Sequence, residues 1–117
     1  MVNKMQKLYF KDLPSHYGEE VRVDGFVDKV RDLQFVQFVV LRDSTDKVQI
    51  TIEKNEENTA INQIVSGLTK ESTVSVKGLL SENPHVKLRG MEVIPTEFVI
   101  TSLAAEELPI DILDYTN

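Results

Sequence analysis

The chain has 117 residues, of which 41% are hydrophobic and 27% are charged, a composition typical of one globular domain. It contains no cysteine, which excludes disulfides and thiolate metal sites, and no apolar run approaches the ~20 residues of a membrane span. The net charge of −6 argues against a general nucleic-acid binder, because such proteins present a basic surface. The acidic excess lies outside residues 21–54, however, so a surface built from that segment could still be neutral or positive.

Two residues that interrupt regular structure, Pro14 and Gly18, indicate a loop or one helical turn over residues 9–20. Alternating valines then predict a strand over residues 21–33. Gly25 lies inside this strand and predicts a bulge or sharp bend, which is the device that curls a sheet into a barrel.

Two further strands and a helix are predicted next. Residues 34–43 and 47–54 alternate apolar and polar side chains, and the Ser-Thr-Asp sequence between them predicts a turn. The apolar period changes to three or four residues over residues 55–70. This change predicts an amphipathic helix that begins near Asn55 and ends near Gly67.

The remaining residues predict two strands, 72–82 and 91–104, joined by a loop. Gly78 lies inside the first of them, and Pro95 should weaken the middle of the second. The order of elements favours an all-β protein with one helix, a five-stranded OB-fold barrel with the helix between strands three and four. A split α+β sheet shares the same order of elements.

We expect the barrel domain to occupy residues 1–105. Residues 106–117 are acidic and contain Pro109, and they predict a linker toward a further domain. The N-terminal residues lack the apolar stretch of a secretory signal, so we expect a cytoplasmic protein without membrane attachment.

No catalytic constellation is found in the sequence. His16 and His85 lie in unrelated segments without the spaced partners of a zinc site, and we expect both to be solvated. The acidic pairs are runs of neighbours on predicted surfaces, and there is no Gly-rich phosphate loop. The sequence therefore predicts binding rather than catalysis, with no metal or cofactor in this chain.

Two phenylalanines in the second predicted strand raise the question of what is bound. Phe35 and Phe38 are three residues apart, so strand alternation would send them to opposite faces. Both faces carry mixed side chains, and the periodicity does not decide which ring is in the core. OB-fold proteins present strands two and three to oligonucleotides, where an outward aromatic ring can stack on a splayed base.

Short motifs that occur in order along the chain resemble the anticodon-binding domain of class IIb aminoacyl-tRNA synthetases, most closely the aspartyl type. The motifs are Gly25-Phe26-Val27, Arg31-Asp32-Leu33, Phe38, Leu41-Arg42-Asp43, Val48-Gln49-Ile50 and the glutamate Glu92 of a Gly-Met-Glu-Val sequence. The resemblance runs from about Leu8 to Ile110.

This resemblance implies a role for several residues. Phe38 would stack on the middle anticodon base, a uridine, while Gln49 would hydrogen-bond the edge of that base and Arg31 would help to hold it. Phe35 would then be the inward or hairpin-packing ring, and Phe26 a core residue. Weaker candidates for contact with a flanking base are Asp28, Lys29 and Lys87.

The resemblance also implies a parent enzyme of the aspartate–tRNA ligase type, which would use ATP and Mg²⁺ in a catalytic domain absent from these 117 residues. Its partner would be the anticodon loop of a tRNA, and it would form a homodimer through the catalytic domain. The same module of an asparaginyl- or lysyl-tRNA synthetase and a free-standing single-strand-binding OB protein stay open as alternatives.

Two positions depart from the family pattern. Where the family often has a pair of small residues after Arg-Asp-Leu, this chain has Gln34-Phe35, which enlarges the predicted hairpin tip. Asp46 replaces the glycine of the following turn, and the neighbouring Asp43 is expected to close that turn.

Overall fold

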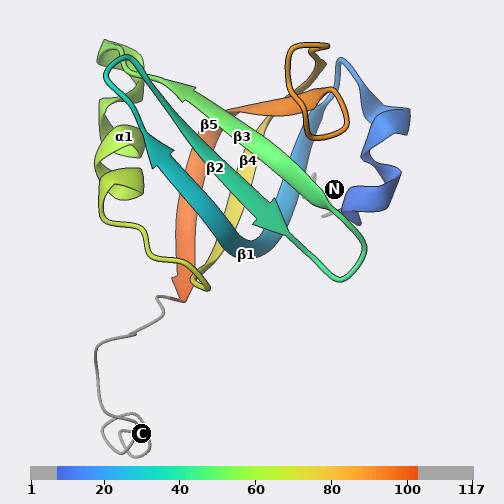
Figure 1. Ribbon diagram of the computed structural model, residues 1–117, viewed down its shortest axis with the longest axis horizontal. Helices are drawn as coiled ribbons and strands as arrows, with labels where there is room; N and C mark the ends of the chain where they lie inside the picture. Colours follow the sequence, from blue (N-terminus) through green and yellow to red (C-terminus); the bar gives the residue numbers. More distant parts are fainter. Residues whose placement is uncertain (1–7, 103–117) are drawn as a thin grey trace, which may run out of the picture.

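The computed structural model describes residues 8–102, which form five strands closed into a barrel, with helices on two opposite sides (Figure 1). The elements are the 3₁₀-helix η1 (Phe10–His16), β1 (Glu20–Asp32), β2 (Val36–Arg42), β3 (Lys47–Glu53), the 3₁₀-helix η2 (Glu56–Asn58), α1 (Thr59–Ser66), β4 (Thr73–Glu82) and β5 (Met91–Ser102). Three strands, a helix and two strands follow in the predicted order, with α1 between β3 and β4. The predicted boundary at residue 105 and the predicted linker over residues 106–117 lie outside the described residues.

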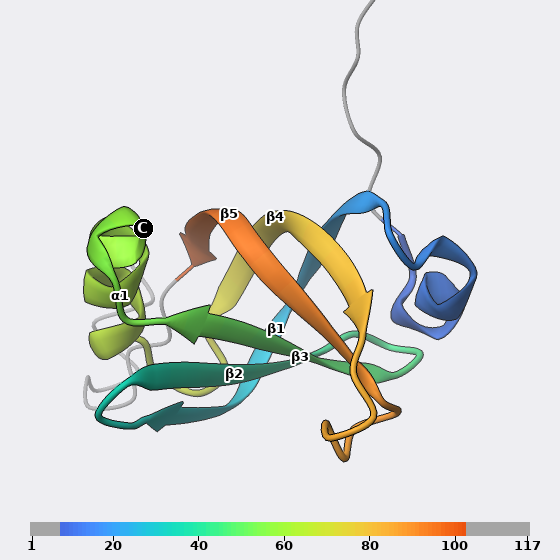
Figure 2. The ribbon, with the colours of Figure 1, turned by 90° about the horizontal axis from the view of Figure 1, so that it is seen from above.

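The strands close in the order β1-β2-β3-β5-β4, and β4 returns to β1. All pairings are antiparallel except that of β3 with β5, which is parallel and joins only Gln49 to Glu92 and Ile50 to Val93. Figure 2 shows β5 crossing over β3 at a steep angle, which is why this pairing is short. The five-stranded barrel is therefore confirmed, and the split sheet is excluded.

The core is built from the inward residue of each alternating pair. The fully or almost fully buried apolar side chains of the first three strands are Val21, Val23, Val27, Val39, Leu41, Val48, Ile50 and Ile52. The segment predicted as a loop or a helical turn is η1, which places Phe10 and Leu13 in the same core with no exposed surface. Burying each of these two side chains stabilises the fold by about 1.5–3 kcal/mol.

Gly25 is a point of close approach rather than the site of the bulge. A Cβ atom at Gly25 would lie 2.6 Å from the carbonyl oxygen of Arg42 and 3.0 Å from the ring of Phe10. The bulge lies three residues further along β1, where the register of β1 against β2 shifts between Val27 and Lys29. Such a bulge re-aims the side chains that follow it. After the shift, Lys29 points to the outside of the barrel.

The prediction that Pro95 weakens β5 is wrong, since the strand runs through it without a break. Pro95 lies opposite Gly78, where the register of β4 and β5 shifts, and on the other edge of β5 the pairing with β3 has already ended at Val93. Proline is tolerated at such irregular or edge positions because no ladder hydrogen bond is lost. A Cβ at Gly78 would lie 2.2 Å from the carbonyl oxygen of Ile94, so glycine permits this close crossing.

Phe26 was predicted to be a core residue and Phe35 an inward or hairpin-packing ring, but both side chains are exposed. Phe26 is 45% exposed because Val27, its neighbour, takes the inward position, and the Arg42 guanidinium lies over the Phe26 ring at 5.3 Å. Phe35 is 73% exposed because it precedes β2, at the tip of the β1–β2 hairpin, where strand alternation does not apply. Gln37 instead takes the first inward position of β2 and is fully buried.

Among residues 8–102, no helix is long and apolar enough to cross a bilayer.

Candidate nucleic-acid interface

A groove of about 1010 Å³ runs over the outer face of β1, β2 and β3 and is walled by the connection between β4 and β5. All six predicted site residues line it: Asp28, Lys29, Arg31, Phe38, Gln49 and Lys87. Phe35, Val40, Thr51, Lys54, His85 and Glu92 line it as well. Residues as far apart in the sequence as Asp28 and Glu92 are thus brought to one surface.

Strand register arranges the centre of the groove in two rows. Arg31 pairs with Phe38, which pairs with Thr51. In the next row Val40 lies between Lys29 and Gln49. Phe38 is half-buried, and both of its chain neighbours are fully buried on the inner face of β2. The Phe38 ring is therefore fixed on the groove side.

Gln49 begins a chain of hydrogen bonds that ends in the β4–β5 connection. Its Nε2 donates to Oγ1 of Thr51 at 3.0 Å, and the Thr51 hydroxyl donates to Oε1 of Glu92 at 2.8 Å. Asn83 Nδ2 donates to the other oxygen of Glu92 at 3.1 Å. These bonds hold the Gln49 amide in one orientation beside Phe38, as recognition of a base edge requires.

Sequence reasoning did not assign Thr51 or Asn83 a role, and it quoted Glu92 only as a motif residue. Thr51 could have been found, because it lies two positions after Gln49 in the same strand and so shares its face. Asn83 is brought to this network only by the way β4 and β5 fold over β3.

The groove carries more positive than negative charge, although the whole chain has a net charge of −6. Five basic residues line it (Lys29, Arg31, Lys47, Lys54 and Lys87) against three acids (Asp28, Glu53 and Glu92). This locally cationic surface is what a polyanionic strand requires.

Two of the groove's cations already have counter-ions. Asp28 forms ion pairs with Lys47 at 3.2 Å and with Arg42 at 3.5 Å, so both of its oxygens are engaged. Lys54 pairs with Asp32 at 2.6 Å. The hydrogen bond from Lys54 is the main reason why the pKa of Asp32 lies below its ordinary value, with further hydrogen bonds from Gln37 and Ser66.

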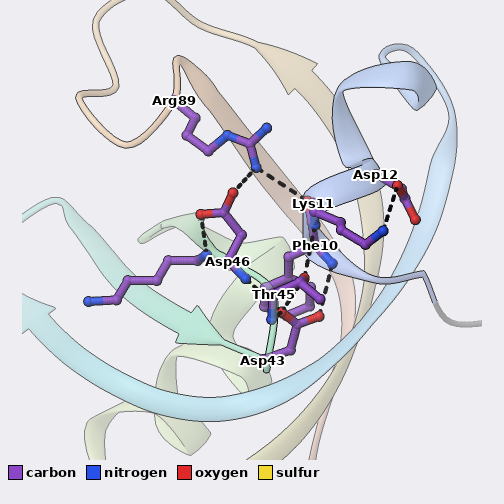
Figure 3. A network of polar contacts seen from close by, with 8 residues as sticks. Phe10, Lys11, Asp12, Asp43, Thr45, Asp46 and Arg89 are labelled. Carbon is purple, nitrogen blue, oxygen red and sulfur yellow. Dashed lines mark hydrogen bonds and ion pairs between the residues drawn. The ribbon is translucent and has the colours of Figure 1, made fainter.

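The turn between β2 and β3 is closed by Asp43, as predicted (Figure 3). Its Oδ1 accepts hydrogen bonds from the backbone N–H and hydroxyl of Thr45 and from the N–H of Asp46, at 2.7–2.9 Å. Its Oδ2 accepts from the N–H of Phe10 at 2.9 Å, which fastens η1 to the turn. Burial alone would raise the pKa of Asp43, but these hydrogen bonds outweigh it and lower the pKa.

Within residues 8–102 the two histidines lie in separate segments and have different surroundings. His16 lies in η1 and contacts Glu19 at 2.9 Å, and His85 is exposed in the β4–β5 connection. Within the part of the chain that the structure describes, no three His, Cys, Asp or Glu side chains are grouped to hold a metal ion.

A closed five-stranded barrel, a helix between strands three and four and an aromatic ring in a cationic groove define an OB-fold nucleic-acid-binding domain. The chain belongs to this class: residues 21–101 match the tRNA anticodon family, described as an OB-fold nucleic acid binding domain. The resemblance noted from the motifs is thereby confirmed.

Among known proteins, the chain is similar to aspartate–tRNA ligases. It is 41% identical over 98 residues to the aspartate–tRNA(Asp/Asn) ligase of Methanopyrus kandleri, covering 84% of this chain and 22% of that protein. It is 37% identical over 94 residues to the aspartate–tRNA(Asp) ligase of Pyrococcus furiosus, covering 80% of this chain and 21% of that protein. The chain thus spans about a fifth of the length of these relatives.

Solved structures share the fold. Asparaginyl-tRNA synthetase from Pyrococcus horikoshii superimposes with a TM-score of 0.77 at 24% identity, over 96% of this chain and 29% of that one. The OBody AM3L09, bound to hen egg-white lysozyme, has a TM-score of 0.77 at 23% identity, over 87% of this chain and 100% of that one.

Proposed function

We propose that this chain recognises the anticodon loop of a tRNA, as the RNA-binding domain of an aspartate–tRNA ligase. The parent enzyme would attach aspartate to tRNA-Asp with ATP and Mg²⁺, in a part of the protein that these residues do not include. It would act in the cytoplasm as a homodimer joined through its catalytic domain. The single observation that carries the proposal is the position of Phe38 and Gln49 on adjacent strands of one cationic groove.

The groove supplies the two contacts that selective recognition of a splayed base needs. The face of the Phe38 ring would stack on the base, an interaction worth about 1–3 kcal/mol for any base. The Gln49 amide, oriented by Thr51, would hydrogen-bond the base edge and so distinguish uridine from cytidine. Arg31, which pairs with Phe38 across β1 and β2, would hold the base or its phosphate from the other side.

The weaker candidates divide by their environment. Lys29 and Lys87 are exposed on opposite walls of the groove and could contact the nucleotides that flank the stacked base. Asp28 is engaged by two cations. We therefore propose that Asp28 positions Lys47 and Arg42 rather than contacting RNA.

The test is a titration of the chain with a short anticodon stem-loop of tRNA-Asp. Phe38→Ala should weaken binding by roughly 5- to 150-fold, the equivalent of one stacked base, without lowering the melting temperature appreciably. Gln49→Ala should bind uridine and cytidine at the middle anticodon position with similar affinities, because the contact it loses is to the base edge.

The matched control is Phe26→Ala, which removes another partly exposed phenylalanine that does not line the groove. Its affinity for the stem-loop should equal that of the unchanged chain. Tight binding to poly-U or to unstructured single-stranded DNA, unaffected by Phe38→Ala, would contradict anticodon recognition and favour a general single-strand binder.

A further inference from the structure

We infer that Phe35 is a second base-stacking platform, so that the groove holds two bases of the bound strand, one on Phe38 and one on Phe35. The inference rests on the proposed function, since it concerns the same groove. It adds a contact that the resemblance to anticodon-binding domains does not supply, because the family often has a small residue at this position.

The position of the Phe35 ring is the first observation. Phe35 is 73% exposed, more than any other large hydrophobic side chain that the structure describes as exposed. A single exposed apolar side chain is ordinary on a protein surface. Phe35, however, lies on the lining of the same groove as Phe38 and Arg31, where a ligand would meet it.

The hairpin tip that carries Phe35 is held in place from three sides. The N–H of Lys54, at the end of β3, donates to the Phe35 carbonyl oxygen at 2.9 Å, and the Leu33 N–H donates to the Val36 carbonyl oxygen at 3.0 Å. The Lys54 ammonium also pairs with Asp32 at 2.6 Å, on the other arm of the hairpin. The ring is therefore presented from a fixed backbone, which lowers the entropy lost on binding.

Hydrogen bonds centred on the buried Gln37 connect the same hairpin to α1. Gln37 Oε1 accepts a hydrogen bond from Asn62 Nδ2 at 2.9 Å, and Gln37 Nε2 donates to Ser66 Oγ at 3.3 Å. Ser66 Oγ in turn donates to Asp32 at 3.4 Å. These bonds connect the start of β2 and the end of β1 to α1, and so restrict movement of the hairpin relative to the barrel.

The spacing of the two rings suits two bases rather than one. Phe35 precedes Phe38 by three positions, with only Val36–Phe38 in the strand, so their Cα atoms lie at most about 10 Å apart. Each ring can therefore take its own base, with the strand running along β2. Arg31 lies on the groove lining beside this path and can meet a phosphate between the bases.

A fluorescence experiment can observe this stacking directly, because the chain contains no tryptophan. Phe35→Trp introduces a single indole at the hairpin tip, and stacking on a base should quench its fluorescence when the anticodon stem-loop is added. The control is Tyr9→Trp, since Tyr9 is 58% exposed but does not line the groove. Its fluorescence should not change.

Affinity measurements on the same RNA identify the base. Phe35→Ala should weaken binding by roughly 5- to 150-fold with an unchanged melting temperature, and Phe35→Leu should not restore it. A stem-loop with an abasic nucleotide next to the base held by Phe38 should also bind the unchanged chain more weakly. The same RNA should bind Phe35→Ala no more weakly than the intact loop does, which is the signature of a lost pairwise contact.

The outcomes separate the two proposals. If Phe38→Ala weakens binding while Phe35→Ala does not, or if no abasic position is coupled to Phe35, the second platform is overturned and anticodon recognition stands. If neither variant changes the affinity, both proposals are overturned.

Discussion

Arg89, in the connection between β4 and β5, forms an ion pair with Asp46 in the turn between β2 and β3 (Figure 3). Arg89 Nη1 also donates to the carbonyl oxygen of Phe10 at 3.5 Å, so three segments distant in sequence meet at one guanidinium. The same connection carries Lys87 over the groove. The position of that wall therefore depends on Arg89.

Removing this contact should loosen the wall more than it destabilises the barrel. For Arg89→Ala and Asp46→Ala, a double-mutant cycle on the free energy of unfolding should give a coupling of about 0.2–1 kcal/mol, the range of partly exposed ion pairs. Amide hydrogen exchange over residues 83–90 should rise in both variants. Lys77→Ala, which breaks an ion pair with Glu97 on β4 and β5, is the control and should leave that exchange unchanged. Additive single effects would show that the pair contributes nothing.

Asp43 predicts a dependence of stability on pH. Its pKa in the folded protein lies below the ordinary value of ~3.9. The ionised form is therefore favoured by folding. The stabilisation is fully present above the ordinary value and is lost as the pH falls through the folded pKa.

The variant Asp43→Asn should accordingly lower the free energy of unfolding at pH 7 by about 1.5–3 kcal/mol, the worth of hydrogen bonds to a charged group. Urea denaturation at a series of pH values should show the difference from the unchanged chain shrinking below about pH 4. Asp12→Asn is the control, because Asp12 is exposed and its carboxylate pairs with the exposed Lys11 at 3.9 Å. A difference that stays constant down to the acid transition would contradict this account.

Gln37 should stabilise the barrel through its hydrogen bonds rather than through its volume. Gln37→Met keeps a side chain of similar size but leaves the partners Asn62 and Ser66 without the buried amide. We expect a loss of about 1–3 kcal/mol in denaturant unfolding. Gln49→Met, on the outer face of the next strand, should change stability by only about 0.5 kcal/mol. Equal effects of the two substitutions would show that the hydrogen bonds of Gln37 do not contribute to the free energy of unfolding.

RNA binding should depend only moderately on salt. Of the five cations in the groove, Lys29, Arg31 and Lys87 have no ion pair among the described side chains, and only these three can readily neutralise phosphates. Three contacts to a single strand give a slope of log K against log salt of about −2. Lys87→Ala should make the slope shallower by about 0.7, while Lys77→Ala, outside the groove, should leave it unchanged. A much steeper slope would indicate a phosphate-dominated, sequence-blind binder.

The sequence predicted the barrel because alternation and glycine placement are local signals. The inward valines of β1 and the turn at Asp43 lie where the pattern put them. The two exposed phenylalanines were misplaced for a different reason. A hydrophobic side chain is expected in the core, but Phe35 lies just before β2. The polar Gln37 takes the inward position instead, because its amide hydrogen-bonds with Asn62 on α1, a contact that only the tertiary structure creates.

The candidate site was assembled from the sequence mostly by resemblance. Periodicity alone did not choose between Phe35 and Phe38, and it gave no hint that Asn83 and Glu92 would meet Thr51. That network depends on the crossing of β5 over β3, a long-range feature without a local pattern. The assignment of Arg31, Phe38 and Gln49 to RNA stays a prediction.

The parallel contact of β3 with β5 has a mechanical consequence. Each of the other four strand pairings of the barrel joins six or more residue pairs, whereas this pairing joins only Gln49 to Glu92 and Ile50 to Val93. Under mechanical force, β3 and β5 should separate before the other pairs of strands. Gln49, which is proposed to recognise the base, lies at this shortest pairing. It is hydrogen-bonded through Thr51 to Glu92 on β5. An RNA bound across β3 and β5 would hold these two strands together. When the RNA dissociates, the barrel would open most easily between them.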